Sequence, residues 1–186
     1  IITTDDNSHA QIACAFLRAG KDVLLEKPMA LVTAECDEMR RVEKETGKRL
    51  MIGQVARYNP VFQKAKKLVE EGTIGELVFV ESEYAHDYMR SRGYNDWRVT
   101  PEREGMIGGG CHAIELMRWM VGNPEKVCAF STKKVLTDWP VDDTTMAIMQ
   151  LPGGAVGKIF CSIGGKKPNM LPISIFGTRG TAVVHN

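Results

Sequence analysis

The stretch Val23-Leu24-Leu25-Glu26-Lys27-Pro28 decides how this sequence is expected to fold. Three aliphatic residues in a row are typical of a short strand that is buried on both faces, as in a parallel sheet. Pro28 has no backbone N–H to donate and holds the residue before it extended, so the strand ends there. Glu26 and Lys27 are thereby predicted at the carboxyl end of a parallel strand, where open α/β sheets bind ligands. Taken alone, the pair also fits two solvated charges at a strand exit.

The segments around this strand alternate between strand and helix patterns, in the order strand 1–4, helix 5–20, strand 23–25, helix 33–47 and strand 50–53. Thr33 is the expected N-cap of the second helix, and Gly47 its expected end. Strand, helix, strand at this spacing predicts two βαβ units and hence a parallel sheet. The strand at Ile1 has no lead-in and no initiating methionine, which indicates an N-terminally truncated chain.

The pattern changes near residues 53–58, where a domain boundary is expected. Asn59-Pro60 favours an N-cap followed by the first residue of a helix. A strand is expected from Leu77 towards Tyr84 or Tyr88, and a helix after Gly108-Gly109-Gly110, whose glycines allow close approach of a backbone or ligand. Further strands are expected over 126–134, 144–151, 155–163, 172–176 and 181–184. The turn at residues 152–154 predicts a hairpin, and with it antiparallel order.

Composition limits the classes of function that fit. The 186 residues are 44% hydrophobic and 25% charged, as in a soluble globular protein. A formal net charge of +1 offers no basic excess for nucleic acid or a membrane surface, and no apolar run reaches the length of a membrane span. The five cysteines are scattered without the close spacing of a zinc site. A reduced, cytoplasmic protein without a metal is therefore expected.

Three groups of residues have chemical potential. Lys27 at the predicted sheet edge could give or take a proton if its surroundings tuned its pKa. His112 lies near a helix start, with Glu115 on the same face to orient the imidazole, although backbone contacts could satisfy this histidine equally well. The loop 94–98 holds Trp97 between charged residues and is either functional or a surface loop with an anchoring tryptophan.

Several of these motifs occur in a fixed order along the chain: Asn7-Ser8-His9-Ala10, Glu26-Lys27-Pro28, Arg57-Tyr58-Asn59-Pro60, Gly72-Thr73-Ile74-Gly75, Trp97-Arg98 and Gly110-Cys111-His112-Ala113-Ile114-Glu115. Each is weak alone, but the ordered set resembles the Gfo/Idh/MocA family. These are NAD(P)-dependent oxidoreductases of the glucose-fructose oxidoreductase and inositol dehydrogenase type. The resemblance covers essentially the whole chain.

The resemblance implies an α/β protein with a partial Rossmann-like parallel sheet followed by an α+β domain. Residues 1–55 would be the C-terminal part of the dinucleotide-binding domain. Residues 56–186 would form the substrate and oligomerisation domain, built on a large, open, mostly antiparallel sheet. The implied activity is hydride transfer between a sugar or polyol carbon and NAD or NADP. A homodimer or higher homo-oligomer would form through the open sheet, with no nucleic-acid or membrane partner.

The resemblance also implies roles for individual residues, and none of them is a metal ligand. Lys27 and His112 would be catalytic. The residues expected to bind the cofactor are Thr4, Asn7, His9, Glu26, Lys27, Trp97 and Arg98. The residues expected to bind substrate, within a border formed by Tyr58 and the region 84–96, are Tyr58, Tyr88, Asp96 and His112.

Two features depart from the family pattern. Gly108 stands four residues before the histidine, where the family usually places an aspartate. The first βαβ unit, whose G-x-G-x-x-G turn would hold the pyrophosphate, is absent from this sequence. These departures keep an alternative open, in which the chain is a non-catalytic ligand-binding or assembly module that retains the fold.

Overall fold

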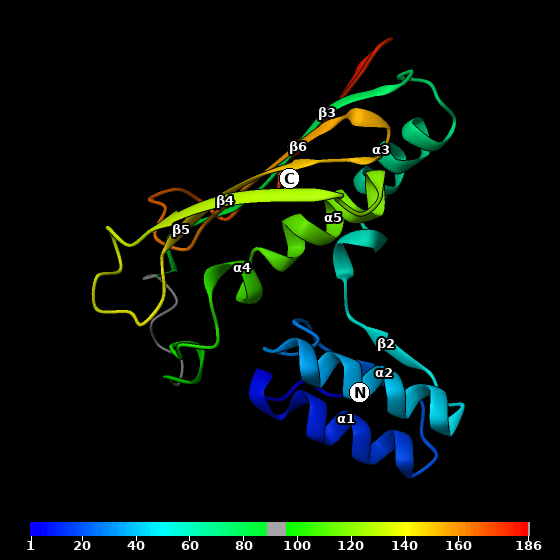
Figure 1. The fold of residues 1–186 in the computed structure, drawn as a ribbon, viewed down its shortest axis with the longest axis vertical. Coiled ribbons are helices and arrows are strands. Elements are labelled where there is room, and N and C mark those ends of the chain that lie inside the picture. The colour runs from blue at the N-terminus through cyan, green and yellow to red at the C-terminus, as the bar shows by residue number, and fades with distance from the viewer. Residues whose placement is uncertain (89–95, 186) are drawn as a thin grey trace. The chain divides into compact units, whose positions relative to one another are not determined.

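A small parallel sheet with two helices forms the first part of the chain (Figure 1). The computed structural model describes residues 1–88 and 96–185. After the short 3-10 helix η1 (Asp6–Ser8), the elements follow in the order α1 (His9–Arg18), β1 (Val23–Leu25), α2 (Thr33–Thr46) and β2 (Leu50–Ile52). Strands β1 and β2 pair in parallel, as the βαβ pattern predicts. Gly47, at φ 64°, takes the left-handed conformation that ends α2.

Two details of this region differ from the predictions. The strands are not buried on both faces, since Leu24 is 38% and Met51 47% exposed. The physical reason is that α1 and α2 both pack into the one cluster that contains Leu25. The predicted N-cap is also wrong: Thr33 is the first helical residue, and Val32 is an N-cap without a side-chain hydrogen bond.

The second part of the chain is built on a six-stranded sheet in the order β4-β5-β6-β3-β7-β8. Its strands are β3 (Leu77–Ala85), β4 (Lys126–Thr132), β5 (Thr144–Gln150), β6 (Val156–Ser162), β7 (Ile173–Gly177) and β8 (Thr181–Val184). Every pair is antiparallel except β3–β6. The predicted hairpin joins β5 to β6 through η5 (Pro152–Gly154).

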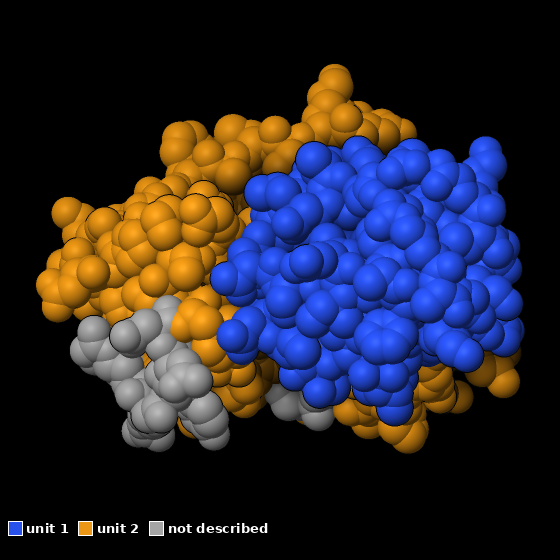
Figure 2. Space-filling model, turned by 90° about the horizontal axis from the view of Figure 1, so that it is seen from below, with its two compact units in different colours: residues 1–54 blue, residues 55–186 orange. Residues whose placement is uncertain are grey.

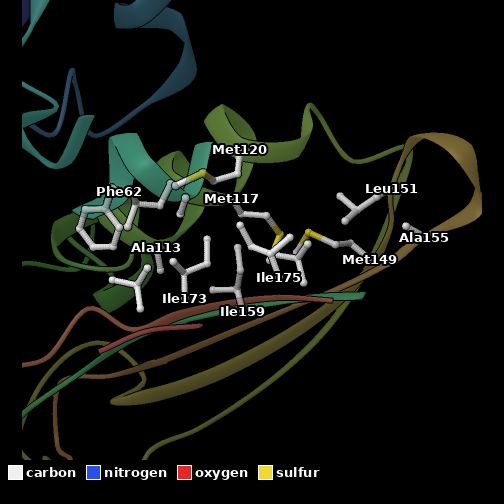
Figure 3. Close-up of a cluster of buried hydrophobic side chains, with 14 of the residues drawn as sticks. Phe62, Ala113, Met117, Met120, Met149, Leu151, Ala155, Ile159, Ile173 and Ile175 are labelled. Atoms are coloured by element: carbon white, nitrogen blue, oxygen red, sulfur yellow. The ribbon is translucent and has the colours of Figure 1, made fainter. Parts of the chain in front are cut away.

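Helices lie on one face of this sheet (Figure 1). They are η2 (Val55–Tyr58), α3 (Pro60–Glu70), α4 (Gly105–Gly108) and α5 (Cys111–Val121). The short η4 (Asp96–Arg98) lies in the connection between β3 and α4. Asn59 caps α3 as predicted, because its side chain accepts a hydrogen bond from the amide of Val61 at 3.0 Å. Figure 3 shows Phe62, Met117 and Met120 of the helices above the sheet residues Ile159, Ile173 and Ile175. Burial of these side chains fixes α3 and α5 on the sheet.

Among residues 1–88 and 96–185, no helix covers the other face of the sheet. Along β5, Ala147 and Met149 are buried while Met146 and Ile148 are exposed, as the alternation of a strand covered on one face requires. Strand β4 is exposed along its whole length. The large, open, mostly antiparallel sheet is thus present.

The chain divides into two compact units, residues 1–54 and residues 55–186, drawn in blue and orange in Figure 2. Each unit has its own hydrophobic cluster. Among the described residues, no helix combines the length and apolarity needed to cross a membrane.

Candidate functional site

Parallel segments of unit 1 end at one edge of its small sheet. Ile2 bridges to Leu25 in parallel, so the chain leaves this edge after Ile2 and again after β1. Glu26 and Lys27 follow β1 directly, which confirms their prediction at the carboxyl end of a parallel strand. The carboxylate of Glu26 accepts a hydrogen bond from the amide of Lys27 at 3.1 Å. This edge is where open parallel sheets bind their ligands.

A polar hollow of about 520 Å³ lies in unit 1. Its lining consists of residues from the end of the first segment, from η1 and from the start of α1: Thr4, Asp5, Asn7, Ser8 and Gln11. Ser8 donates a hydrogen bond to the hydroxyl of Thr4 at 2.8 Å. Two of the predicted cofactor-binding residues, Thr4 and Asn7, therefore share one surface that presents hydroxyl, amide and carboxylate groups to a polar ligand.

His9 has a different place from Thr4 and Asn7, because it is buried. Its Nδ1 lies 2.8 Å from the carbonyl oxygen of Pro28, and its Nε2 lies 3.2 Å from that of Thr4. The imidazole thus connects the loop after β1 to the segment after Ile2. His9 braces the two loops at the sheet edge rather than facing solvent.

A pocket of about 460 Å³ lies within unit 2. Residues from η2, α3, β3, α5 and the loop before β7 line it: Val55, Ala56, Asn59, Phe62, Tyr84, His112, Asn169, Met170 and Leu171. The rings of Tyr84 and His112 stack with their centroids 5.8 Å apart. The hydroxyl of Tyr84 lies 3.0 Å from Nε2 of His86. The lining of the pocket therefore combines groups that can exchange protons with apolar side chains such as Phe62 and Leu171.

Burial shifts the pKa values of Tyr84 and His86, whose side chains lie within hydrogen-bond distance. It raises the pKa of the Tyr84 phenol well above its usual range, an effect that the Arg103 cation only partly opposes. It also lowers the pKa of His86, against the influence of Asp87. A protonated phenol beside a neutral imidazole can donate a hydrogen bond to it and still accept one from a ligand hydroxyl.

The predicted site residues of unit 2 do not all come together in one place. His112 lines the pocket, whereas Tyr58 is 62% exposed and is not among its lining residues. Tyr88 and Trp97 lie instead around the guanidinium of Arg103. The guanidinium of Arg98 stacks over the Trp97 ring at 4.0 Å. Asp96 opens η4, and the first two residues of the predicted loop 94–98 lie outside the described residues.

Glu115 does not serve the predicted purpose of orienting His112. Its carboxylate accepts a hydrogen bond of 2.5 Å from Nε of Arg57, and a second from the same guanidinium. Arg57 also lies over the Trp119 ring, 5.9 Å from its centroid. The ion pair instead joins η2 to α5, two of the elements that line the pocket.

The glycine triplet allows close approach, as predicted, but the neighbours are parts of this chain. A Cβ atom on Gly109 would overlap the ring of Tyr84. A Cβ atom on Gly110 would lie 2.8 Å from Cα of Met106. The triplet therefore lets Tyr84 lie directly on the backbone that leads into α5.

Sequence reasoning missed Tyr84 and His86 as individual site residues, although it placed a substrate border there. Their i, i+2 spacing at a strand end, which puts both on one face, was a usable indication. It also missed Asn169, Met170 and Leu171, for which the sequence offers no local pattern. No group of three or more His, Cys, Asp or Glu side chains converges within residues 1–88 and 96–185.

Comparison with known proteins identifies both units. Residues 1–54 match the model of the oxidoreductase family with an NAD-binding Rossmann fold, and residues 62–183 match the GFO/IDH/MocA C-terminal domain. Trans-1,2-dihydrobenzene-1,2-diol dehydrogenase of Mus musculus is 31% identical over 98% of this chain and 54% of its own length. This chain spans about half the length of the curated relatives it matches.

Solved structures agree with this assignment. Levoglucosan dehydrogenase in complex with NADH superimposes with a TM-score of 0.91 at 28% identity, over 99% of this chain and 53% of the other. The WlbA dehydrogenase of Bordetella pertussis, in complex with NADH and UDP-GlcNAcA, gives 0.89 at 26% identity, over 100% and 54%. Both family models, in the order found here, lead to one conclusion. This chain belongs to the Gfo/Idh/MocA family of oxidoreductases.

Proposed function

We propose that the protein is an NAD(P)-dependent oxidoreductase that acts on a hydroxyl or carbonyl group of a sugar, polyol or similar substrate. Residues 1–55 would belong to the dinucleotide-binding domain, and residues 56–186 would form the substrate and oligomerisation domain. The relatives named as dehydrogenases of an inositol, of levoglucosan and of a dihydrodiol support this substrate class. Two of the similar structures hold NADH.

The observation that carries the proposal is the placement of Lys27. It lies at the ligand-binding edge of a parallel sheet, in the unit that matches the NAD-binding family model. The residues present suit such a cofactor, because Thr4 and Asn7 line a polar hollow and Glu26 lies at the same edge as Lys27. The resemblance to the family also assigns Trp97 and Arg98 to the cofactor.

Proton transfer is the part of the reaction that this chain would supply. A nicotinamide cofactor, when bound, would supply the chemistry of hydride transfer. Lys27 would take the proton of the substrate hydroxyl in the direction of oxidation, and His112 is proposed as a second proton-transfer residue. Tyr88 and Asp96 are proposed to border the substrate, and Tyr58 to reach it from η2. His9 supports the cofactor edge through its contacts with Thr4 and Pro28.

The test is cofactor binding by the full-length gene product. NADH and NADPH are titrated separately by their fluorescence, and turnover is then measured with myo-inositol, levoglucosan and trans-1,2-dihydrobenzene-1,2-diol. Saturable binding of at least one cofactor, together with reduction of NAD or NADP by one polyol, is expected. A protein that binds neither cofactor would rule the proposal out.

Gly108 is the observation that favours a second candidate function. The chain lacks the carboxylate that the family usually places there, which fits a non-catalytic ligand-binding or assembly module. The two candidates differ in their dependence on Lys27. If the full-length Lys27→Ala variant oxidises the polyol as fast as the unchanged protein, the catalytic assignment fails and the module is favoured.

We also propose that the open face of the six-stranded sheet forms a homodimer or a higher homo-oligomer. Phe130, 79% exposed, pairs with Met146 across β4 and β5, and Ile148 lies on the same face. An exposed apolar face of this kind is typical of association surfaces. Ile148→Asp should shift the protein towards the monomer in analytical ultracentrifugation. Val61→Asp, on the exposed side of α3, is the matched control. Identical sedimentation of both variants would contradict the proposed interface.

A cytoplasmic location completes the proposal. The five cysteines are all free thiols, including exposed Cys128, as is usual in a reducing compartment. Fractionation of cells that produce the tagged protein tests this location. Recovery of the protein in a secreted or membrane fraction would contradict it.

A further inference from the structure

An arginine fills the space beside Gly108. A Cβ atom built on Gly108 would overlap the guanidinium of Arg103, so that any other residue at position 108 would displace this arginine. Arg103 is only 6% exposed, which is rare for a charged side chain. The family resemblance places an aspartate at position 108, four residues before His112. This chain therefore keeps a cation at the point where a carboxylate is usual.

The guanidinium of Arg103 joins separate segments of unit 2. Its Nη1 lies 3.5 Å from the hydroxyl of Tyr88, just beyond the end of β3. Its central carbon lies 5.3 Å from the centroid of the Trp97 ring in η4. It also lies beside the backbone of Gly108, at the end of α4. One side chain thus spans the end of β3, η4 and the glycine segment that leads to His112.

The neighbours of Arg103 are themselves packed. The ring of Tyr88 lies 5.0 Å from that of His86 and 5.9 Å from that of Trp139, measured between centroids. The guanidinium carbon of Arg98 lies over the Trp97 ring, 4.0 Å from its centroid. A shift of Arg103 would therefore move side chains on both the substrate border and the expected cofactor segment.

We propose that Arg103 is a positioning residue of the candidate site, which holds Tyr88 and Trp97 in place against the glycine backbone before His112. The proposal rests on the proposed function, since that function gives Tyr88 to the substrate and Trp97 to the cofactor. A planar guanidinium suits this task because one edge can reach a hydroxyl while its face or another edge meets an aromatic ring. Gly108 is the residue that makes room for it.

The kinetic test uses the full-length gene product, with NADH fluorescence for cofactor affinity and the polyol that supports turnover for KM. Arg103→Gln should raise both the Kd for NADH and the KM for the polyol about three- to tenfold, the size of one lost contact each. Arg103→Lys keeps a cation beside Trp97 but lacks the fork that reaches Tyr88. It should therefore restore the Kd for NADH while KM stays raised. A merely structural role would not separate the two constants.

Gly108→Ala tests the same contact from the other side. Its added methyl group would displace the guanidinium, so the variant should resemble Arg103→Gln, and the double variant should be no worse than either single one. Gly105→Ala is the matched control in the same short helix, since its Cβ would meet Ile163 at an ordinary 3.4 Å. Arg118→Gln is the control for loss of an exposed arginine, and both controls should behave as the unchanged protein.

Hydrogen exchange on the same variants separates this inference from the proposed function. Arg103→Gln and Gly108→Ala should speed exchange of the amides of 86–88 and 97–98, and leave those of β5 and β6 unchanged. If the unchanged protein binds neither NADH nor NADPH, the proposed function fails while this exchange result still decides the role of Arg103. Exchange and kinetic constants that stay at the unchanged protein's values in both variants would overturn the inference.

Discussion

The Glu26-Lys27 pair of unit 1 and the buried charges Arg103 and Asp143 of unit 2 are held in different ways. Glu26 and Lys27 of unit 1 reach their place because a strand ends beside them, and both remain partly exposed. Arg103 and Asp143 of unit 2 are buried and depend on contacts with several segments. Function in unit 1 is therefore expected to be separable from stability. In unit 2, substitution of a buried charged residue should affect both function and stability.

The largest effect is expected at Lys27. Lys27→Ala in the full-length gene product should lower kcat by about a thousandfold, the usual contribution of a general acid–base group. The melting temperature should stay the same, because the side chain is not part of the buried core. Lys21→Ala, an exposed lysine just before β1, is the control and should keep full activity. A Lys27→Ala variant with a lower melting temperature and an unchanged kcat would contradict this difference between the units.

The next largest effect is expected at Asp143, this time on stability. Its Oδ2 accepts hydrogen bonds from the amides of Lys134, Val135 and Leu136 at 2.9, 2.6 and 2.9 Å. Asp143→Ala leaves these amides without their acceptor and should lower the free energy of unfolding by about 3 kcal/mol, measured by urea denaturation. Asp138→Ala, at an exposed aspartate in the same loop, should have little effect. Equal midpoints for the two variants would show that the buried carboxylate does not anchor the loop.

A smaller effect is expected from acidification. Burial lowers the pKa of His86 from 6.5, so the folded protein binds fewer protons than the unfolded chain as the pH falls below that value. The free energy of unfolding should therefore decrease from pH 7 to pH 5. His86→Gln should make this decrease shallower. Asp143 does not contribute to the pH dependence in this range, because its pKa lies below the ordinary 3.8. Burial alone would raise this pKa, but the hydrogen bonds from backbone amides lower it by more. An unchanged slope in the variant would assign the dependence to another group.

The smallest effect is expected on the surface of unit 1. Arg41 pairs with Glu38 at 2.5 Å and with Glu45 at 2.6 Å, and all three side chains are well exposed. Solvent and salt screen such pairs, so Arg41→Gln should leave the urea midpoint within experimental error. A clearly lower urea midpoint for Arg41→Gln at low salt would show that exposed charge pairs of unit 1 do contribute to its stability.

Local patterns were enough to predict most elements of the fold. The alternating strands and helices of residues 1–54 and the cap at Asn59 depend on neighbours within a few residues, which a sequence displays directly. The exposed faces of Leu24 and Met51 were not predicted, because exposure depends on how many helices pack on the sheet and not on the strand itself. The same applies to the parallel pairing of β3 with β6, which joins strands far apart in the chain.

The candidate site was predictable only where its residues belong to ordered motifs. Lys27 and His112 stand in such motifs, but the partner of Glu115 proved to be Arg57, 58 residues away. Arg103 shows no pattern at all, since its importance comes from the space that Gly108 leaves. Long-range contacts of this kind are decided by tertiary packing, which spacing along the chain does not reveal.

The two close approaches at the glycine segment have a consequence for evolution. Tyr84 occupies the space at Gly109 and Arg103 the space at Gly108, so each glycine is tied to one particular side chain. Positions 84 and 109, and positions 103 and 108, should therefore covary among descendants of this sequence. A lineage that regains an acidic residue at 108 should lose the arginine at 103 in the same interval.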